Sequence, residues 1–403
     1  YLSSNAAKNL FMTTGSFNDN TVDPFNILNG TLDTIQAPVT IETGLGGNGG
    51  TRDLVYASSS GSTSMVSGEM TTANDINTLT GLGMTGQIDL VIPEDITKSE
   101  GVTQYQSGFI FIGLGSADDT FQVKSLSPQA IAEIYGRGGE DTLNIGNENN
   151  SLSEISGITA FFGGADHDTL NVFGNATTPL DQLSAISLTG LEMGTNALFS
   201  THERFGANYD NNLLDQYPGA IYYATRTTEN EEDTITSDVE TVNLQLGAEA
   251  DALVIDSTYE GETNIQGGGG EDIFTVQSTE TGLTPEDINR VDFIRGTVNL
   301  DGETVILNDQ GDDNPNIGTY QGNTVSGLDM TGSVTFENSE NVEIRLGEQD
   351  DTFYVPATDA NMITTLRTGG NNDTIYVGTT EGNEDSGSLD NILGQLILEG
   401  QEP

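Results

Sequence analysis

The chain has no cysteine among its 403 residues, and it carries only 11 basic residues against 62 acidic ones. Without cysteine it forms neither disulfides nor thiolate metal sites, which is compatible with an oxidising or seawater-like exterior. Eleven scattered cations cannot supply the basic patches that nucleic acid or anionic lipid needs, so we expect no nucleic-acid partner. No apolar run approaches the roughly 18 residues of a membrane span, so we expect no membrane insertion.

Recognisable catalytic patterns are also missing. There are only two histidines, His167 and His202, and the chain has no HExxH pair, no GxSxG elbow and no phosphate-cradling GxxxxGK[ST] loop. Acidic residues are so abundant that two of them close together carry almost no information about glycosidase chemistry. We therefore expect the protein not to be an enzyme.

The formal net charge of −51 has two interpretations. One is solubility and self-repulsion in a salty medium, and the other is the binding of divalent cations. Disorder is disfavoured, because 34% of the residues are hydrophobic and many of them stand in short runs of Val, Ile, Leu, Phe and Tyr.

A glycine-bearing turn that closes on an aspartate and runs into a short strand recurs eight times. The copies are GGNGGTRDLVY from Gly46, GLGSADDTFQV from Gly113, GRGGEDTLNI from Gly136, GGADHDTLNV from Gly163, LGAEADALVI from Leu246, GGGGEDIFTV from Gly267, LGEQDDTFYV from Leu346 and GGNNDTIYV from Gly369. Such a recurring unit predicts a repeat architecture. Glycines let backbone carbonyls turn inward, and with the carboxylates beside them they form an oxygen-only site suited to a hard cation.

The spacing of these turns predicts the fold. Closing aspartates are 22, 21 and 22 residues apart in three places: Asp119 to Asp141, Asp251 to Asp272 and Asp351 to Asp373. That near-constant interval fits one rung of a parallel solenoid, with two or three short strands and their turns. We expect an all-β, parallel β-solenoid of the β-roll or β-helix kind, with hairpin or loop excursions. One weak helical segment, SPQAIAEIY at residues 127–135, is expected at a corner.

A longer period groups the rungs into tandem units. A Gly-Leu-x-Met marker recurs in LTGLGMTG, LTGLEMGT and VSGLDMTG, and we interpret it as a turn with a buried methionine in a hairpin-like excursion. The predicted divisions are the end of a preceding unit (1–28), three units (29–148, 149–287 and 288–386) and the start of a fourth (387–403). Because the chain begins with Tyr1 and ends within the pattern, we expect it to be a piece of something longer.

Two of the turns carry a resemblance to a known family. The segment GGGGEDIF from Gly267 matches Gly-Gly-x-Gly-x-Asp-x-apolar in full, and GGADHDTL from Gly163 matches it with Asp166 in the fourth place. The pattern resembles the hemolysin-type calcium-binding repeats of giant secreted or cell-surface bacterial proteins. It departs from that family in its period, because the motif occurs once per rung of about 21 residues and not every nine.

Calcium is the cofactor that this resemblance implies. The candidate ligands are the aspartates of the turns, which adjacent rungs would present together: Asp119, Asp141, Asp166, Asp168, Asp251, Asp272, Asp351 and Asp373. Turns of this composition also form without metal, because an aspartate can cap a turn by accepting backbone N–H bonds. A further acidic loop, NDQGDDN at residues 308–314, is a weaker cation candidate without the distal Glu of an EF-hand.

An aromatic excursion at residues 196–226 stands apart from the repeats. Its candidate partner-binding residues are Phe205, Tyr209, Tyr217, Tyr222 and Tyr223. Aromatic rings with nearby Asn and Asp are what a glycan or protein-partner site uses, and a small satellite core beneath a long loop is the other interpretation.

The family resemblance implies an extracellular or cell-surface location and a structural role. The expected function is a calcium-stabilised stalk or filament segment that supports attachment to cells or surfaces through self-association or neighbouring repeats. The alternative is an adhesin module that recognises a glycan or a partner protein through the 196–226 excursion. Deleting that excursion should abolish attachment in the second case and leave assembly intact in the first.

Overall fold

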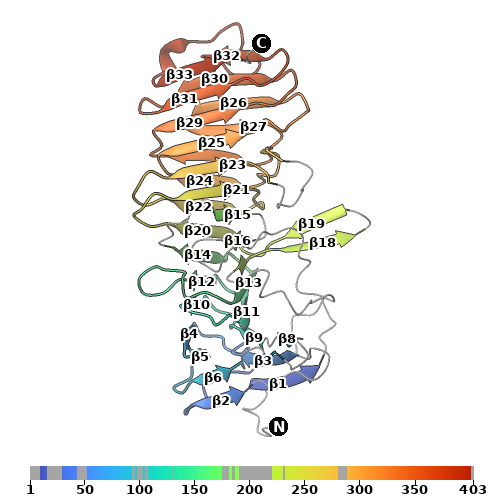
Figure 1. Ribbon diagram of the computed structural model, residues 1–403, viewed down its shortest axis with the longest axis vertical. Coiled ribbons are helices and arrows are strands. Elements are labelled where there is room, and N and C mark those ends of the chain that lie inside the picture. The colour runs from blue at the N-terminus through green and yellow to red at the C-terminus, as the bar shows by residue number, and fades with distance from the viewer. Residues whose placement is uncertain are drawn as a thin grey trace. The chain divides into compact units, whose positions relative to one another are not determined.

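The computed structural model describes residues 10–15, 30–42, 52–92, 96–97, 103–104, 108–128, 130–174, 181–183, 187–189, 220–229, 232–279 and 288–400. The chain forms two compact units, and Figure 1 labels their strands. Compact unit 1 comprises Tyr1–Gly174, Ile186–Ala197 and His202–Val242, and compact unit 2 comprises Asn175–Ala185, Leu198–Thr201 and Asn243–Pro403. The division between them falls inside the predicted repeat unit 149–287, so the sequence repeats and the compact units are different divisions of the chain.

Compact unit 1 contains two sheets of stacked strands. The first has the order β1 (Leu10–Gly15), β3 (Arg52–Ser58), β9 (Gly108–Gly113), β11 (Ala130–Gly138), β13 (Ile158–Ala165), β17 (Ile221–Tyr222) and β16 (Ser187–Thr189). The second has the order β2 (Val39–Glu42), β6 (Ile88–Val91), β5 (Ile76–Gly81), β4 (Ser67–Ala73), β10 (Thr120–Val123), β12 (Thr142–Ile145), β14 (Thr169–Phe173) and β20 (Thr241–Gln245). Two small antiparallel pairs accompany them: β7 (Ile96–Thr97) with β8 (Thr103–Gln104), and β18 (Thr225–Glu229) with β19 (Glu232–Thr236).

Compact unit 2 repeats the two-sheet plan. One sheet has the order β15 (Asp181–Leu183), β21 (Ala252–Ile255), β23 (Ile273–Val276), β25 (Thr304–Asn308), β29 (Asn341–Arg345), β31 (Ile363–Arg367) and β33 (Gln395–Glu399). The other has the order β22 (Glu262–Gln266), β24 (Thr297–Asp301), β28 (Ser333–Glu337), β27 (Thr324–Gly327), β26 (Ile317–Gly322), β30 (Thr352–Thr358) and β32 (Thr374–Val377). One 3₁₀ helix, η2, covers Leu389–Asn391. Among the described residues, no helix is long and apolar enough to cross a membrane.

In the regular coils, successive strands alternate between the two sheets, and a strand pairs in parallel with its equivalent one coil later. Ala252 of β21 pairs with Ile273 of β23, and Asn341 of β29 pairs with Ile363 of β31. These offsets are 21 and 22 residues, as the spacing of the aspartates predicted. The all-β parallel solenoid is therefore confirmed, with two strands in each coil.

The hairpin-like excursions are confirmed in both compact units. Strands β4, β5 and β6 form an antiparallel meander set into an otherwise parallel sheet, and β26, β27 and β28 do the same in compact unit 2. The Gly-Leu-x-Met marker forms the turn that follows β5 and β27. Its methionines, Met84 and Met330, are 8% and 7% exposed. They are buried packing residues, as the sequence indicated.

The core lies between the two sheets, where every second side chain of a strand points inward. Strands β10, β12 and β14 all show this alternation of buried and half-exposed residues. Because the register is parallel, inward residues stack in columns, such as Phe121 on Leu143 on Leu170. Burying one such side chain stabilises the fold by about 1.5–3 kcal/mol. Because the columns run from coil to coil, the contacts with neighbouring coils supply most of the stability of each coil.

The expected helical segment at 127–135 is wrong. Residues from Ala130 onward form strand β11, and its first seven residues are all buried. Strand β11 pairs with β9 on one side and with β13 on the other. The spacing of its Ala and Ile residues resembled a helix, but burial on both faces and pairing at both edges favour the strand instead.

We predict that inward and outward positions of one strand differ sharply in their effect on stability. Phe274 is completely buried in β23, and Ile273 beside it is 44% exposed. Phe274→Ala should lower the free energy of unfolding by about 3–5 kcal/mol, because it leaves a cavity in the column. Ile273→Ala should cost less than about 1 kcal/mol. Urea denaturation measures both variants, and equal losses would contradict the column packing.

Candidate cation-binding turns

From Asp119 onward, each closing acid lies directly before the first residue of a strand, so the stacking of strands also stacks the acids. The backbone amide of Asp119 donates a hydrogen bond of 2.7 Å to Oδ1 of Asp141, one coil later. The amide of Asp141 donates in the same way to Asp168 Oδ1, at 2.8 Å. The amide of Asp168 then donates to Oε2 of Glu240, at 2.7 Å. The result is a carboxylate ladder, in which each acid accepts from the amide of the acid before it.

The same ladder recurs in compact unit 2. The amide of Asp251 donates to Asp272 Oδ1 at 2.9 Å, and the amide of Asp272 donates to Glu303 Oε2 at 2.7 Å. In a second column, the amide of Asp351 donates to Asp373 Oδ1 at 3.0 Å. The three pairs with a near-constant spacing in the sequence, 119–141, 251–272 and 351–373, are therefore neighbours in the structure, and so is the pair 141–168. Their service as calcium ligands stays a prediction.

The glycines of the motif make room for these carboxylates. A Cβ atom on Gly136 would lie 2.5 Å from Oδ2 of Asp141, far inside van der Waals contact. Cβ atoms on Gly163 and Gly267 would collide with Oδ2 of Asp168 and of Asp272 in the same way. Glycine is required at these positions because the buried carboxylate occupies the space of its missing side chain, together with the carbonyl oxygen of Gly163 at Gly136 and of Asp238 at Gly163.

Two kinds of turn differ in what they offer the second carboxylate oxygen. Where the glycine stands four residues before the acid, its amide donates to Oδ2, as Gly115 does to Asp119 at 2.6 Å and Gly347 to Asp351 at 3.2 Å. In two turns where the glycine stands five residues before, those closed by Asp141 and Asp168, Oδ2 is buried and has no hydrogen-bond partner. The five-residue turns are the ones closest to the calcium motif.

Burial makes these two carboxyl groups weaker acids than an ordinary aspartate. The Asp141 and Asp168 side chains are 1% and 0% exposed. Loss of water raises the pKa of Asp141 to about 8 and that of Asp168 to about 7. Repulsion from neighbouring carboxylates adds to the rise, and the hydrogen bond from the preceding amide opposes it. An Oδ2 atom in this setting needs either a proton or a cation, and a carboxylate beside inward-turned glycines is the donor set that calcium uses.

An outer layer of acids faces water. Asp166 is exposed, and its Oδ2 accepts from the amide of Gly139 at 3.3 Å. Asp118 is exposed as well and accepts from the amide of Glu140 at 3.0 Å. The buried row and the exposed row both bring carboxylates to the turn edges of the coils, and the repulsion between these carboxylates is a cost that cations would relieve.

Glu240 and Glu303 were missed as ladder members, because both stand outside the glycine-aspartate motif. A simpler signal finds them: an acid followed directly by Thr at the start of a strand. The dipeptides at 119–120, 141–142, 168–169, 240–241, 303–304, 351–352 and 373–374 all follow it. The threonine begins the strand, and the acid caps the turn before it.

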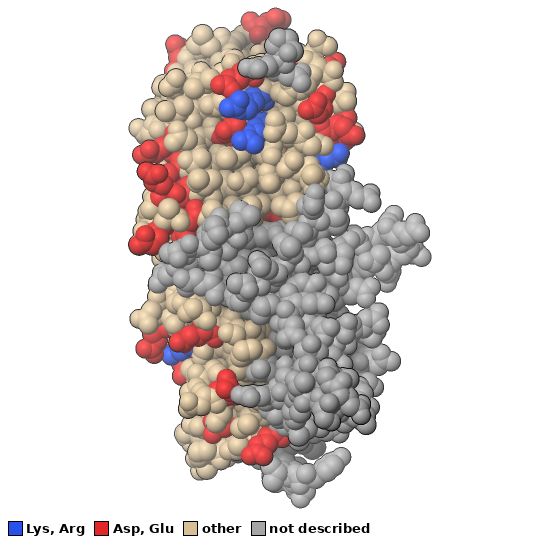
Figure 2. All heavy atoms as spheres, in the orientation of Figure 1, with Lys and Arg blue, Asp and Glu red and all other residues tan. Residues whose placement is uncertain are grey.

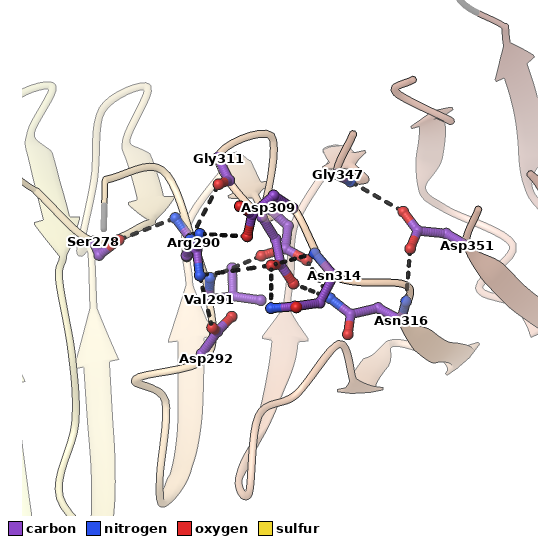
Figure 3. A network of polar contacts seen from close by, with 12 residues as sticks. Ser278, Arg290, Val291, Asp292, Asp309, Gly311, Asn314, Asn316, Gly347 and Asp351 are labelled. Carbon is purple, nitrogen blue, oxygen red and sulfur yellow. Dashed lines mark hydrogen bonds and ion pairs between the residues drawn. The ribbon is translucent and has the colours of Figure 1, made fainter. Parts of the chain in front are cut away.

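A separate acidic cluster lies in compact unit 2 (Figure 3). Asp292, Asp309 and Asp312 each place an oxygen within 4.8 Å of the other two. Among the described residues, this is the one group of three carboxylates that close together. Asp309 and Asp312 belong to the 308–314 loop that the sequence marked as a weak cation candidate. Asp292 was missed, because nothing in the sequence shows that its turn adjoins that loop.

The aromatic excursion gives a different result from the one expected. Tyr222 and Tyr223 are 5% and 1% exposed, so they are core residues of compact unit 1 and do not present a partner surface. Their burial favours a packing role over partner binding for these two rings, and Tyr222 packs as part of β17 in the main sheet. Phe205, Tyr209 and Tyr217 lie outside the described residues.

Comparison with known proteins adds no relative. No protein-family model matches the chain, and no curated protein matches it.

We predict that the ladder contributes measurably to stability at each rung. Asp272→Ala removes the acceptor of the Asp251 amide and should lower the free energy of unfolding by about 1–3 kcal/mol. Asp272→Asn keeps an acceptor oxygen and should recover most of that loss. Glu271→Ala changes the exposed acid beside it and should cost less than about 0.5 kcal/mol. Urea denaturation in chelator decides the matter, and equal stability of the Asp272→Ala and Glu271→Ala proteins would contradict the ladder.

We also predict an inverted pH dependence in chelator. The folded-state pKa values of Asp141 and Asp168, about 8 and about 7, lie above their ordinary value of 3.8. The folded protein therefore holds protons that the unfolded chain has already released. This contribution to stability is complete below pH 4 and is lost as the pH rises through 7 and 8. The melting midpoint should fall between pH 6 and pH 9.

The control for the pH prediction is the double variant Asp141→Asn with Asp168→Asn, which cannot titrate at these sites. Its melting midpoint should vary less with pH than that of the wild type over the same range. Parallel profiles would show that the general relief of acidic repulsion, and not these two groups, sets the dependence.

Proposed function

We propose that this chain is a non-enzymatic structural segment of an extracellular repeat protein, a calcium-stabilised stalk or filament that supports attachment to cells or surfaces. The observation that carries the proposal is the carboxylate ladder. The same acid-to-amide bond recurs from coil to coil, at 2.7–3.0 Å, in both compact units. A hydrogen bond that is repeated at each rung stabilises the stacking of rungs, whereas the catalytic residues of an enzyme occur together at a single site.

The distribution of perturbed groups supports a structural role. Active sites collect ionisable groups with shifted pKa values in one cleft. Here five of the carboxyl groups with a raised pKa, Asp119, Asp141, Asp168, Asp272 and Asp351, are ladder members spread along the coils. Two more, Asp292 and Asp309, belong to the separate acidic cluster. Burial is the main cause for each. The shifts of the ladder members arise from rung stacking, and a solenoid of this kind supplies reach and stiffness to the protein that contains it.

Calcium fits the ladder because of its five-residue turns. The buried Oδ2 atoms of Asp141 and Asp168 lack a hydrogen-bond partner, and a cation would remove both the desolvation cost and the repulsion between rungs. Acidic side chains also far outnumber basic ones on the face drawn in Figure 2. An extracellular location supplies calcium at the concentration that weak sites need. The resemblance to hemolysin-type repeats points the same way.

Fewer of the candidate residues remain in support of the alternative function, an adhesin module. Two of its five aromatic residues, Tyr222 and Tyr223, are buried. It would need the remaining residues of the 196–226 excursion to bind a glycan or a partner protein. Loss of attachment on deleting residues 196–216, which spares both buried rings, would favour this second function over the first.

Thermal melting with calcium and with chelator tests the calcium part of the proposal. Calcium at one hundred times its Kd should add about 2.7 kcal/mol of stability for each site that only the folded state forms. The gain should shrink in the Asp141→Asn, Asp168→Asn double variant and persist in Asp119→Asn, whose turn already satisfies both carboxylate oxygens. Identical wild-type curves, with no ion detected by calorimetry, would refute the calcium claim.

A further inference from the structure

We propose that Asp292, Asp309, Asp312 and Asn316 form a binding site for one Ca²⁺ ion in compact unit 2, separate from the glycine-aspartate turns. The site goes beyond the proposed function, because it uses none of the ladder carboxylates and does not require the turns to bind calcium. Its ligands come from two segments of the chain. Asp292 lies in the turn before β24, and the other three lie between β25 and β26.

The two carboxylates at the centre of the site are fully buried. Asp309 and Asp312 are both 0% exposed, and the third, Asp292, has a side chain that is 21% exposed. Oδ1 of Asp309 accepts from the amide of Val291 at 3.1 Å, and Oδ1 of Asp312 accepts from the amide of Asn314 at 3.0 Å. These bonds fix the orientation of each carboxylate. The Oδ2 atoms of both residues then face the side chain of Asn316.

Asn316 is the observation that points to a ligand. Its side chain is 3% exposed and lies against Asp309 and Asp312, yet its own Oδ1 has no hydrogen-bond partner. Its Nδ2 lies 3.4 Å from Asp309 Oδ2 and closer than a normal hydrogen bond to Asp312 Oδ2. Rotating the amide by a half turn would exchange the two atoms. Oδ1 would then join the carboxylate oxygens around a cation, and Nδ2 would no longer be crowded against Asp312.

A second oxygen in the site lacks a partner. Oδ1 of Asp292 is buried and makes no hydrogen bond. With the two Oδ2 atoms and the rotated Asn316 amide, the site therefore offers four side-chain oxygens. Calcium takes six to eight oxygen ligands, at about 2.3–2.6 Å, so waters or backbone carbonyls would complete the sphere.

Arg290 is a basic residue beside the cluster, and it shares its charge between the cluster and Asp313 (Figure 3). Its short contacts are Nη2 to Asp313 Oδ1 and Nε to the carbonyl of Gly311, both 3.0 Å. Its Nη1 atom is 3.6 Å from Asp312 and 3.9 Å from Asp292. One guanidinium at that distance leaves most of the charge of three carboxylates uncompensated, and a divalent ion would balance the remainder.

The ligand set favours calcium over magnesium. The site offers four side-chain oxygens from the protein, whereas Mg²⁺ usually keeps several waters and is bound through one or two carboxylates. The absence of sulfur and imidazole ligands also suits a hard cation.

Calcium titration of the full-length chain, stripped with chelator and followed by calorimetry, tests the site. The decisive variant is Asp292→Asn, which keeps the shape of the side chain at the more exposed edge of the cluster. It should lose one equivalent of bound calcium, or bind that equivalent at least about tenfold more weakly. Asp313→Asn is the matched control: Asp313 is in the same loop and contacts Arg290, but it is 74% exposed and outside the cluster. It should bind as the wild type does.

Two further variants keep the outcome decisive. Arg290→Gln removes the local counter-charge, so calcium should raise its melting midpoint by more than it raises that of the wild type. An equal rise, or unchanged binding by Asp292→Asn, would overturn the site. Asp141→Asn is run alongside: a loss of calcium there with none in Asp292→Asn supports the turns alone. The reverse result supports this cluster and refutes the turn sites.

Discussion

The hydrogen bond from the backbone amide of one closing acid to the carboxylate of the next is the interaction on which this structure depends. A parallel solenoid satisfies the backbone within its strands easily, but its corners leave amides without partners. Here the acid before each strand solves that problem with one side chain. The geometry then requires the carboxylate to be buried, and burial in turn requires glycine where the carboxylate needs space, as at Gly136 beside Asp141.

The same solution creates the electrostatic character of the molecule. Stacking the acids buries them and brings like charges to successive rungs, and the resulting desolvation and repulsion raise the pKa values of Asp141 and Asp168. The turns before different acids also differ in length. In the turns closed by Asp119 and Asp351 the glycine amide donates to Oδ2, whereas Oδ2 of Asp141 and of Asp168 has no hydrogen-bond partner. The environment of a closing carboxylate therefore depends on the number of residues between glycine and acid as well as on composition.

Much of the fold could be predicted from the sequence, because a constant interval between repeated turns directly reports the length of a coil. The Gly-Leu-x-Met turns were predictable for a similar reason, since a recurring apolar residue in a tight turn needs a place to be buried. Local periodicity did not predict the correct secondary structure where a strand is buried on both faces, as in β11. It also failed at Tyr222 and Tyr223, whose aromatic character did not show which way they face. Asp292 could not be found, because excursions of different length decide which turns become neighbours.

The ladder also has a direction. Each acid accepts from the rung before it and offers its own amide to the rung after it, so a stack cut between two rungs has two unlike faces. One face presents carboxylates, and the other presents bare N–H groups with partial positive charge. Opposite faces are complementary, whereas two faces of the same kind would bring carboxylates against carboxylates or donors against donors. Rungs of this design can therefore be joined head to tail but not head to head, which makes the solenoid a polar polymer.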